Sequence, residues 1–494
     1  MRKLSVILGV PIDDLTMPQA MDRIGAFITA ARRDGRLRQI ATVNADFVVK
    51  SFQDPELLDI LQHADMLTAD GMPLVWGARL LGVPLEGRVT GADMVPALAQ
   101  RAAQEGWSLY FLGAAPGVAA RAGEILQERY PGLEIAGVYS PPLSTIFEME
   151  PAIVERINAS GADVLLVAFG NPKQEKWINM HRTALTCAVA VGVGGSFDFI
   201  AGQTKRAPAW MQKSGLEWLY RLLQEPRRLW KRYVVDMAGF GAFFLWQWWQ
   251  NRRGARRATV LPRTEAFTVG SAAVIAVSGR LDLTSRDRFL ALVDDALADD
   301  AITGVIVNLA ETTFVDSAGM GALVQVAKRA RERGGEVRLA AAPRPVAQAL
   351  AAARLDRLFE MAGDLEAALA GGTVEPGKPA PAAPAEPRPA GDWFVLPLPR
   401  QVRVDALDGL KTTFDEAAGL HSQIILDCSG AEFIDSAGLA VIIGLQKRLA
   451  AGGGALRLAA LSPNVQRIVQ LSRLDRVFDL YPSVKAATGS RPDR

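Results

Sequence analysis

Short apolar runs alternate with amphipathic segments over the first 200 residues of the chain. In the amphipathic segments apolar residues recur every three or four positions, the period of a helix packed on one face, whereas the apolar runs have the length of buried strands. The strand-like runs lie in 38–49, 107–113, 133–140, 162–170 and 187–195. The helix-like segments are 51–65, 116–130 and 172–182. This alternation predicts an open α/β sheet with helices on both faces, a fold that binds ligands at the carboxyl ends of its strands.

The extreme N-terminus is also apolar, but it is not typical of a signal peptide. Its apolar run is short and continues into Pro11, Asp13 and Asp14, and no small-residue cleavage site follows. We therefore expect a first β-strand here.

Residues 203–258 have a different pattern, rich in Arg, Lys and Trp. An apolar stretch between Arg232 and Arg252 is interrupted by Asp236 and Gln247, so it falls short of the roughly 20 apolar residues of a transmembrane helix. Basic residues flank the stretch on both sides, and aromatic and basic residues together favour a helix in a membrane interface. A helix packed on the sheet or in an oligomer interface is the alternative.

The C-terminal half contains an internal repeat. FVDSAGM at 314–320 matches FIDSAGL at 433–439, and LDRLF at 355–359 matches LDRVF at 474–478, both at an offset of 119 positions. Two separate matches at one offset indicate a tandem domain duplication. The Pro- and Ala-rich segment between the copies predicts an extended, mobile linker. The predicted domains and connections are residues 1–235, 236–261, 262–370, 371–392 and 393–490.

Composition narrows the class of protein. With 494 residues, 49% hydrophobic and 22% charged, the chain has the size of about three domains and an ordinary globular balance. A formal net charge of +2 gives no indication of a nucleic-acid partner. Cys187 and Cys428 are far apart, which favours free thiols in a reducing compartment over a disulfide framework. No Cys/His cluster has metal-ligand spacing, so no metal cofactor is expected.

Polar or glycine-rich motifs follow several predicted strands. Gly113 opens a strand-to-helix turn whose free N–H groups suit a phosphate, although such turns are also ordinary connections. Asp70 lies on a turn before Gly71, where a carboxylate could act as a general base or cap its own backbone. Further motifs occupy 42–44, 170–175 and 192–206, the last with glycines that allow close approach of a ligand or tight packing. The large aromatic residues of the helical segments are expected in the core, namely Trp177, Trp210 and Trp218.

Taken in order, these motifs resemble one family of enzymes. The blocks TVN, ADGMPLVWGARLLG, RVTGAD, GNPKQEKW, GVGGSFDFIAG, KRAP and GLEWLYRLLQEPRR look like the WecG/TagA/CpsF glycosyltransferases (glycosyltransferase family 26) over about residues 4–235. The resemblance implies transfer of an N-acetylmannosamine-type sugar from a UDP donor to a polyprenyl-diphosphate-linked sugar, with inversion, in cell-envelope or exopolysaccharide synthesis. It also implies a Rossmann-like sheet and a cytoplasmic enzyme that is peripheral on the inner face of the cell membrane.

The resemblance assigns roles to matching positions. Asp70 would be the catalytic base, with Thr42 and Asn44 lining its pocket. Gln174, Glu175, Gly194 and Asp198 would belong to the donor pocket. The positions of Gly113, Gly170 and Lys173 after predicted strands make them further candidates for donor binding. No Asp-x-Asp motif precedes residue 260, so positive side chains would stabilise the diphosphate in place of a metal. The candidates are Arg206, Arg221, Arg228 and Lys231. The last three could instead form a basic face that meets anionic lipid.

The repeated half resembles the STAS domain of anti-sigma factor antagonists. VIAVSGRLDLTSRDRF and GVIVNLAETTFVDSAGMGALVQV carry the likeness in the first copy, and IILDCSGAEFIDSAGLAVIIGL carries it in the second. Ser317 and Ser436 match the position phosphorylated in that family, although a serine there could simply cap a helix. The second copy lacks the turn that residues 279–282 provide in the first, so its first strand is expected to be altered. An unknown protein partner of these domains is expected.

Two other functions compete with this interpretation. The chain could be a signalling scaffold with an inactive transferase half, although it retains the polar residues that the family pattern requires. A Rossmann oxidoreductase is disfavoured because no G-x-G-x-x-G motif follows a strand with an acidic residue about 20 positions later.

Overall fold

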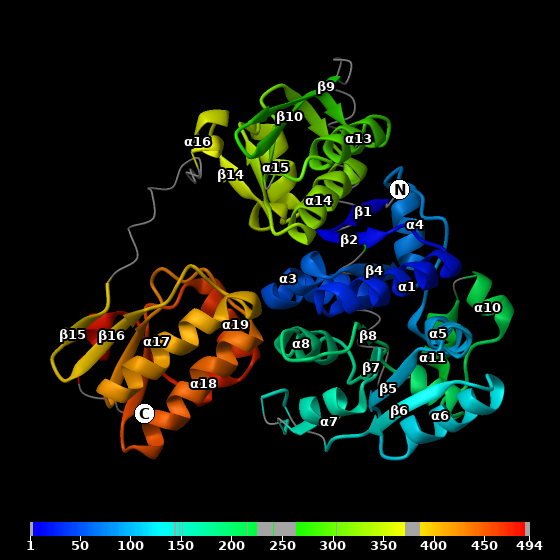
Figure 1. Ribbon diagram of the computed structural model, residues 1–494, viewed down its shortest axis with the longest axis horizontal. Coiled ribbons are helices and arrows are strands. Elements are labelled where there is room, and N and C mark those ends of the chain that lie inside the picture. The colour runs from blue at the N-terminus through cyan, green and yellow to red at the C-terminus, as the bar shows by residue number, and fades with distance from the viewer. Residues whose placement is uncertain are drawn as a thin grey trace.

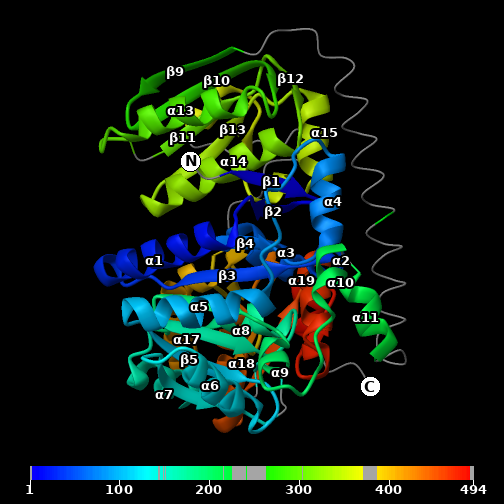
Figure 2. The ribbon, with the colours of Figure 1, turned by 90° about the vertical axis from the view of Figure 1, so that its right-hand side faces the viewer.

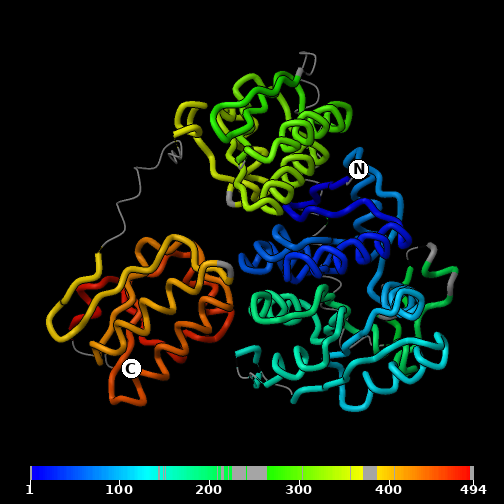
Figure 3. The backbone as a smooth tube through the Cα atoms, viewed as in Figure 1, coloured from blue at the N-terminus to red at the C-terminus, as the bar shows by residue number. Residues whose placement is uncertain are grey.

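The computed structural model describes residues 3–142, 145–147, 149–150, 152–214, 216–224, 241, 263–302, 304–370 and 386–489. These form an N-terminal unit (residues 3–224), a first repeat (263–370) and a second repeat (386–489), as Figure 1 shows. In the backbone trace of Figure 3 the two repeats lie against different parts of the N-terminal unit. Apart from residue 241, the predicted interfacial helix at 236–261 lies outside the described residues, as does 371–385 of the predicted linker.

The N-terminal unit is built on a six-stranded parallel sheet with the order β4-β3-β8-β7-β5-β6. Its strands are β3 (Arg38–Val43), β4 (Met66–Ala69), β5 (Ser108–Gly113), β6 (Glu134–Tyr139), β7 (Val164–Ala168) and β8 (Val189–Gly192). Its helices are α1 (Met17–Asp34), α2 (Ala45–Gln53), α3 (Pro55–His63), α4 (Met72–Leu80), α5 (Gly91–Glu105), α6 (Val118–Arg129), α7 (Ala152–Ser160), α8 (Lys173–Met180), α9 (Ser196–Ile200), α10 (Ala209–Ser214) and α11 (Glu217–Gln224). The predicted α/β fold with a parallel sheet is confirmed.

The buried strands of this sheet have apolar residues on both faces because helices cover both. Val164 and Leu166 belong to a core shared with α1, α5 and α6. Leu165 and Val167 belong to a second core with α7 and α8. Successive side chains of a strand point to opposite faces, so a continuous apolar run is what this position requires.

The predicted first strand is instead a hairpin outside the main sheet. β1 (Leu4–Ile7) pairs antiparallel with β2 (Val10–Asp13). Leu8 and Gly9 form the turn, both with positive φ. Leu4 and Val6 are buried in the core of the first repeat, whereas alternate residues of the hairpin pack against α2 and α3. The hairpin therefore joins the N-terminal unit to the first repeat.

The helix predicted at 51–65 is divided into α2 and α3. Asp54 ends α2 and caps α3, because its side chain accepts a hydrogen bond from Leu57 N over 3.1 Å. Pro55 follows at the first position of α3, where its missing N–H costs nothing. The cap and the proline together explain the break.

The first repeat is a small α/β unit with the sheet order β12-β10-β11-β13-β14, and β9 pairs antiparallel with β10. Its strands are β9 (Arg263–Val269), β10 (Ala272–Leu281), β11 (Gly304–Asn308), β12 (Thr312–Val315), β13 (Glu336–Ala340) and β14 (Glu360–Ala362). Its helices are α13 (Arg286–Leu297), α14 (Ser317–Glu332), α15 (Arg344–Ala352) and α16 (Leu365–Leu369).

The second repeat has the sheet order β15-β16-β18-β20-β21 and a separate pair of β17 and β19. Its strands are β15 (Arg388–Ala390), β16 (Trp393–Pro397), β17 (Gln401–Val402), β18 (Gln423–Asp427), β19 (Phe433–Ile434), β20 (Ala455–Ala459) and β21 (Asp479–Tyr481). Its helices are α17 (Leu407–Leu420), α18 (Ser436–Ala451), α19 (Pro463–Leu471) and α20 (Val484–Ala487). The expected alteration of its first strand is confirmed: β10 is continuous, whereas the corresponding segment is split into β16, which ends at Pro397, and β17, with Pro399 between them.

Candidate functional site

The parallel strands bring the separate sequence motifs to one edge of the sheet. Val43 of β3 lies opposite Ala69 of β4, and Asp70 N donates to Val43 O over 2.6 Å. On the other side β3 pairs with β8, which pairs with β7. The motifs at 42–44, 69–73, 170–175 and 192–206 therefore follow the carboxyl ends of four neighbouring strands, the usual ligand site of this fold.

Asp70 lies at the end of β4, immediately before α4. Its Oδ2 accepts a hydrogen bond of 3.3 Å from the N–H of Gly91, the first residue of α5. Gly71 has a φ of 125°, which favours glycine and lets the chain turn directly into α4. The Asp70 side chain is only partly buried.

Thr42 and Asn44 are brought next to Asp70 by β3. The Thr42 hydroxyl donates to the carbonyl of Gly192 over 3.3 Å, which links β3 to β8. Asn44 caps α2, because its side-chain oxygen accepts from Phe47 N over 3.1 Å. The three residues predicted to form the catalytic pocket therefore lie on adjacent strand ends.

Gln174 and Glu175 are buried at the start of α8. Oε1 of Gln174 accepts from the N–H groups of Gly170 and Gly194, both at 3.1 Å. Its Nε2 donates to Glu175 Oε1 over 2.7 Å, and burial raises the pKa of Glu175 to about 8. One side chain thus links the loops after β7 and β8. Direct contact of these residues with a donor remains a prediction.

The other predicted donor residues surround these loops. Gly113 has a φ of 102°, and a Cβ there would lie 2.7 Å from the carbonyl oxygen of Ala168, so close packing of β5 and β7 requires glycine. Lys173 Nζ lies 5.4 Å from the centre of the Phe169 ring. Asp198 lies on α9, where its backbone carbonyl accepts from Gln203 N over 2.9 Å.

A polar network beside the pocket was missed from the sequence. Lys50 Nζ lies 2.9 Å from Asp46 Oδ2 and donates to the carbonyl of Asn171 over 3.2 Å. The Asn171 amide donates to the same Asp46 oxygen over 3.2 Å. Asp46 and Lys50 follow Asn44 on α2 at a helical spacing, but only the fold brings them to the loop after β7. They tie α2 to that loop.

Arg206 is held by carboxylates. Its guanidinium contacts Asp93 at 2.5 and 2.9 Å and Glu217 at 3.4 Å. Arg88, in the RVTGAD motif, contacts the other oxygen of Glu217 at 3.2 Å. Although burial acts in the opposite direction, the hydrogen bond from Arg206 holds the pKa of Asp93 below its ordinary value. A diphosphate would have to replace these carboxylates as the partner of Arg206.

Several other expectations have mixed outcomes. Trp177 is fully buried as expected, but Trp210 is 64% exposed, so the core placement was wrong for that residue because its helix lies on the surface. Arg221 lies on α11, and Arg228 and Lys231 lie outside the described residues.

Among described residues, no group of three or more His, Cys, Asp or Glu side chains is arranged for a metal ion. In the same part of the chain, no helix has the length and apolar composition needed to cross a membrane.

Both predicted phosphorylation positions are buried. Ser317 and Ser436 are the first residues of α14 and α18, and each is 0% exposed. The helix caps are the preceding aspartates: Asp316 accepts from Ala318 N, and Asp435 accepts from Gly438 N. The alternative in which serine is the cap is therefore wrong, since the aspartate occupies that position. Phosphorylation remains a prediction.

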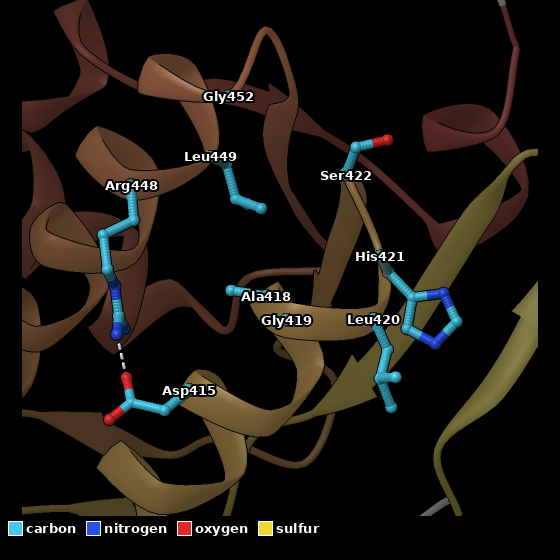
Figure 4. Close-up of a pocket in the computed structure, with 9 residues that line it drawn as sticks. All are labelled: Asp415, Ala418, Gly419, Leu420, His421, Ser422, Arg448, Leu449 and Gly452. Atoms are coloured by element: carbon cyan, nitrogen blue, oxygen red, sulfur yellow. Dashed lines mark hydrogen bonds and ion pairs between the residues drawn. The ribbon is translucent and has the colours of Figure 1, made fainter.

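A surface hollow of about 530 Å³ lies elsewhere, in the second repeat (Figure 4). It lies where α17 and α18 end, and an ion pair between Arg448 and Asp415 crosses it. His421 at its margin stacks on Phe394 with ring centres 4.0 Å apart. None of its lining residues comes from the edge of the main sheet, so it is separate from the candidate site.

Comparisons with known proteins agree with the order of these motifs. The sequence model of the WecG/TagA/CpsF glycosyl transferase family matches residues 5–254, and that of the STAS domain matches 263–368 and 388–487. A relative from Bacillus spizizenii is 38% identical over 195 residues, which are 40% of this chain and 74% of that protein. Its name is N-acetylglucosaminyldiphosphoundecaprenol N-acetyl-beta-D-mannosaminyltransferase.

Several solved structures similar to the chain are anti-sigma factor antagonists. A candidate antagonist from Thermotoga maritima is 27% identical, and the match covers 21% of this chain and 90% of that chain with a TM-score of 0.20. One from Mycobacterium paratuberculosis is 20% identical, covering 22% and 93% with a TM-score of 0.21. With the family match over residues 5–254, the chain belongs to the WecG/TagA/CpsF glycosyl transferase family and is a glycosyltransferase that carries two STAS domains.

Proposed function

We propose that the N-terminal unit transfers an N-acetylmannosamine-type sugar from a UDP donor to a polyprenyl-diphosphate-linked amino sugar in cell-envelope or exopolysaccharide synthesis. The name of the Bacillus relative includes both this sugar and such an acceptor. The observation that carries the proposal is the position of Asp70 beside Thr42 and Asn44, at the sheet edge formed by the family motifs. The two STAS domains serve regulation or docking.

In the proposed reaction Asp70 accepts the proton of the acceptor hydroxyl. The hydroxyl oxygen forms a bond to the anomeric carbon as the bond from that carbon to UDP breaks, and UDP leaves with the electron pair. Attack from the face opposite UDP inverts the configuration. Charge that develops on UDP is stabilised without a metal by the positive side chains Arg206, Arg221, Arg228 and Lys231.

We place the enzyme at the cytoplasmic face of a membrane, where a polyprenyl acceptor would be found. Trp76 and Leu80 on α4 are 44% and 62% exposed, and Trp210 on α10 is 64% exposed. α4 begins two residues after Asp70, and Figure 2 shows α4 and α10 on the same side of the molecule. Exposed aromatic and apolar residues near the pocket suit contact with lipid.

The test is UDP release by the full chain from UDP-N-acetylmannosamine with a polyprenyl-diphosphate-N-acetylglucosamine analogue. Removing a general base in Asp70→Asn should slow release by at least about 10²-fold. Activity should survive a chelator, because no step needs a metal. Circular dichroism of the variant controls for folding.

Two outcomes would contradict the proposal. If the wild type released no UDP from any of a panel of UDP-sugars, with intact acceptor present, the result would favour the signalling scaffold. Full activity of Asp70→Asn would remove Asp70 from the reaction while leaving the family assignment unchanged.

A further inference from the structure

Both repeats contact the N-terminal unit through equivalent helices, α14 and α18, but at different places. In the first repeat the start of α14 packs on β1. In the second repeat the start of α18 reaches α3 and α8: Ser436 N donates to the Glu56 carboxylate, and Asn179 donates to Asp435 Oδ2 over 3.4 Å. Figure 1 shows α18 and α19 facing α3 and α8.

The second contact is rich in charged groups. Arg403 lies 2.8 Å from Asp59 Oδ1 on α3, and its guanidinium donates to His63 Nε2 over 3.0 Å. Glu56 is 0% exposed and accepts from the start of α18. Burial, and then the charge of Glu56, raise the pKa of Asp435 to about 7. Charged groups held this closely fix the register of a contact, and the contact depends on their charge state.

This contact continues into the candidate donor pocket through α8. Lys176 Nζ lies 2.8 Å from Glu56 Oε2 and 2.7 Å from Asp54 Oδ2. Lys176 lies two positions after Gln174, whose side chain links the loops after β7 and β8. The helix α8 thus contacts the pocket loops through Gln174 and the second repeat through Asn179.

We propose that α3 and the outer side of α8 form a docking surface for the Asp435-Ser436 end of the second repeat, and that docking positions α8 and the donor-pocket loop at 170–175. Lys176, Asn179 and Glu56 are then positioning residues. The predicted change in donor binding rests on the proposed transferase function, whereas the docking contact itself does not.

The two docking places are not interchangeable. A Cβ at Gly321 of α14 would lie 2.1 Å from the Leu4 carbonyl oxygen, so only glycine permits the first contact. The equivalent residue of α18, 119 positions later, is Ala440, which excludes the second repeat from β1. The second repeat therefore does not fit the place on β1, and its own contacts are with α3 and α8.

The decisive variant is Arg403→Glu in the full chain, since Arg403 belongs to the second repeat and leaves the transferase pocket unaltered. Hydrogen–deuterium exchange is measured at the start of α18 and in α8, and the donor KM and kcat are measured by UDP release. We expect exchange at both helices to rise at least about tenfold, because opening of a contact exposes its amides. The donor KM should rise more than kcat falls.

Two further variants separate docking from folding. Asp59→Arg combined with Arg403→Glu restores the opposite charges and should return exchange and KM toward wild type. Arg448→Glu makes the same charge change in the same repeat, where its ion pair is with Asp415 of that repeat, and should change neither.

Each outcome has a distinct meaning. Unchanged exchange at α18 in Arg403→Glu would overturn the docking surface. Faster exchange at α18 with unchanged exchange in α8 and unchanged donor KM would overturn the positioning role. Faster exchange at both helices in a protein that releases no UDP would support docking while contradicting the proposed transferase function.

Discussion

The two repeats are copies of one fold, yet they are joined to the N-terminal unit by different physical chemistry. The first contact is centred on a shared apolar core: Leu4 and Val6 are buried among residues of the first repeat, and α14 is buried along most of its length. Lys328 and Arg354 of the first repeat add hydrogen bonds to backbone carbonyls of the N-terminal unit. The second contact is made largely by ion pairs and hydrogen bonds around Glu56 and Asp435. An apolar core has no titrating group, whereas charged contacts respond to pH and are screened by salt. The first repeat therefore has the properties of a permanent part, and the second those of a dissociable module.

The largest expected effect tests the apolar contact. Leu4→Ala removes a fully buried side chain from the core of the first repeat, so the free energy of unfolding should fall by about 2–5 kcal/mol. Urea denaturation of the full chain measures this change. A loss below 1 kcal/mol would mean that β1 is not an integral part of that core.

A somewhat smaller effect is expected from Gly321→Ala. The added methyl group overlaps the carbonyl oxygen of Leu4, and overpacking of this kind costs about 1–3 kcal/mol. Ala440→Gly is the matched reverse change in α18, and it should cost no more than the helix propensity of about 1 kcal/mol. Equal effects of the two substitutions would remove the distinction between the repeats.

The smallest effects concern pH and only the second repeat. The pKa of Asp435 is raised to about 7 when docked, by burial and by the nearby charge of Glu56, so the docked state binds this proton more tightly. Docking should therefore weaken as pH rises from the ordinary carboxyl range toward 7, by at most about tenfold per pH unit for one proton, and should not change further through this group above 7. Energy transfer between labels on the second repeat and the N-terminal unit measures this change, and Asp435→Asn should abolish it.

Protonation of His63 should affect docking of the second repeat in the opposite direction. Burial, followed by the charges of Arg331 and Arg403, holds its pKa well below the ordinary value. Its Nδ1 bonds the carbonyl of Asp59, which leaves Nε2 to accept from Arg403 only while the ring is neutral. Protonation of His63 should thus oppose docking as pH falls below about 6.5 and offset the gain from Asp435 in that range, and His63→Gln should uncover the full Asp435 dependence in the same assay.

Much of the site could be predicted from the sequence. Motifs after parallel strands must meet at one edge, so Asp70, Asn44 and Gly170 could be grouped without coordinates. The network of Asp46, Lys50 and Asn171 could not, because its members lie on different elements and only packing sets their distance. Trp210 was misplaced because an exposed and a buried helix can carry similar aromatic residues.

The sequence by itself determined the parallel sheet, the order of the family motifs and the duplication of the STAS domain, because periodicity and repeated motifs are local properties of the chain. Only the tertiary structure decided where the two copies attach. A single methyl group separates Gly321 from Ala440, and whether it matters depends on which backbone approaches the helix. Likewise, the sequence shows Glu56 and Asp435 as two ordinary acidic residues, and only their burial in one contact makes the second repeat sensitive to charge.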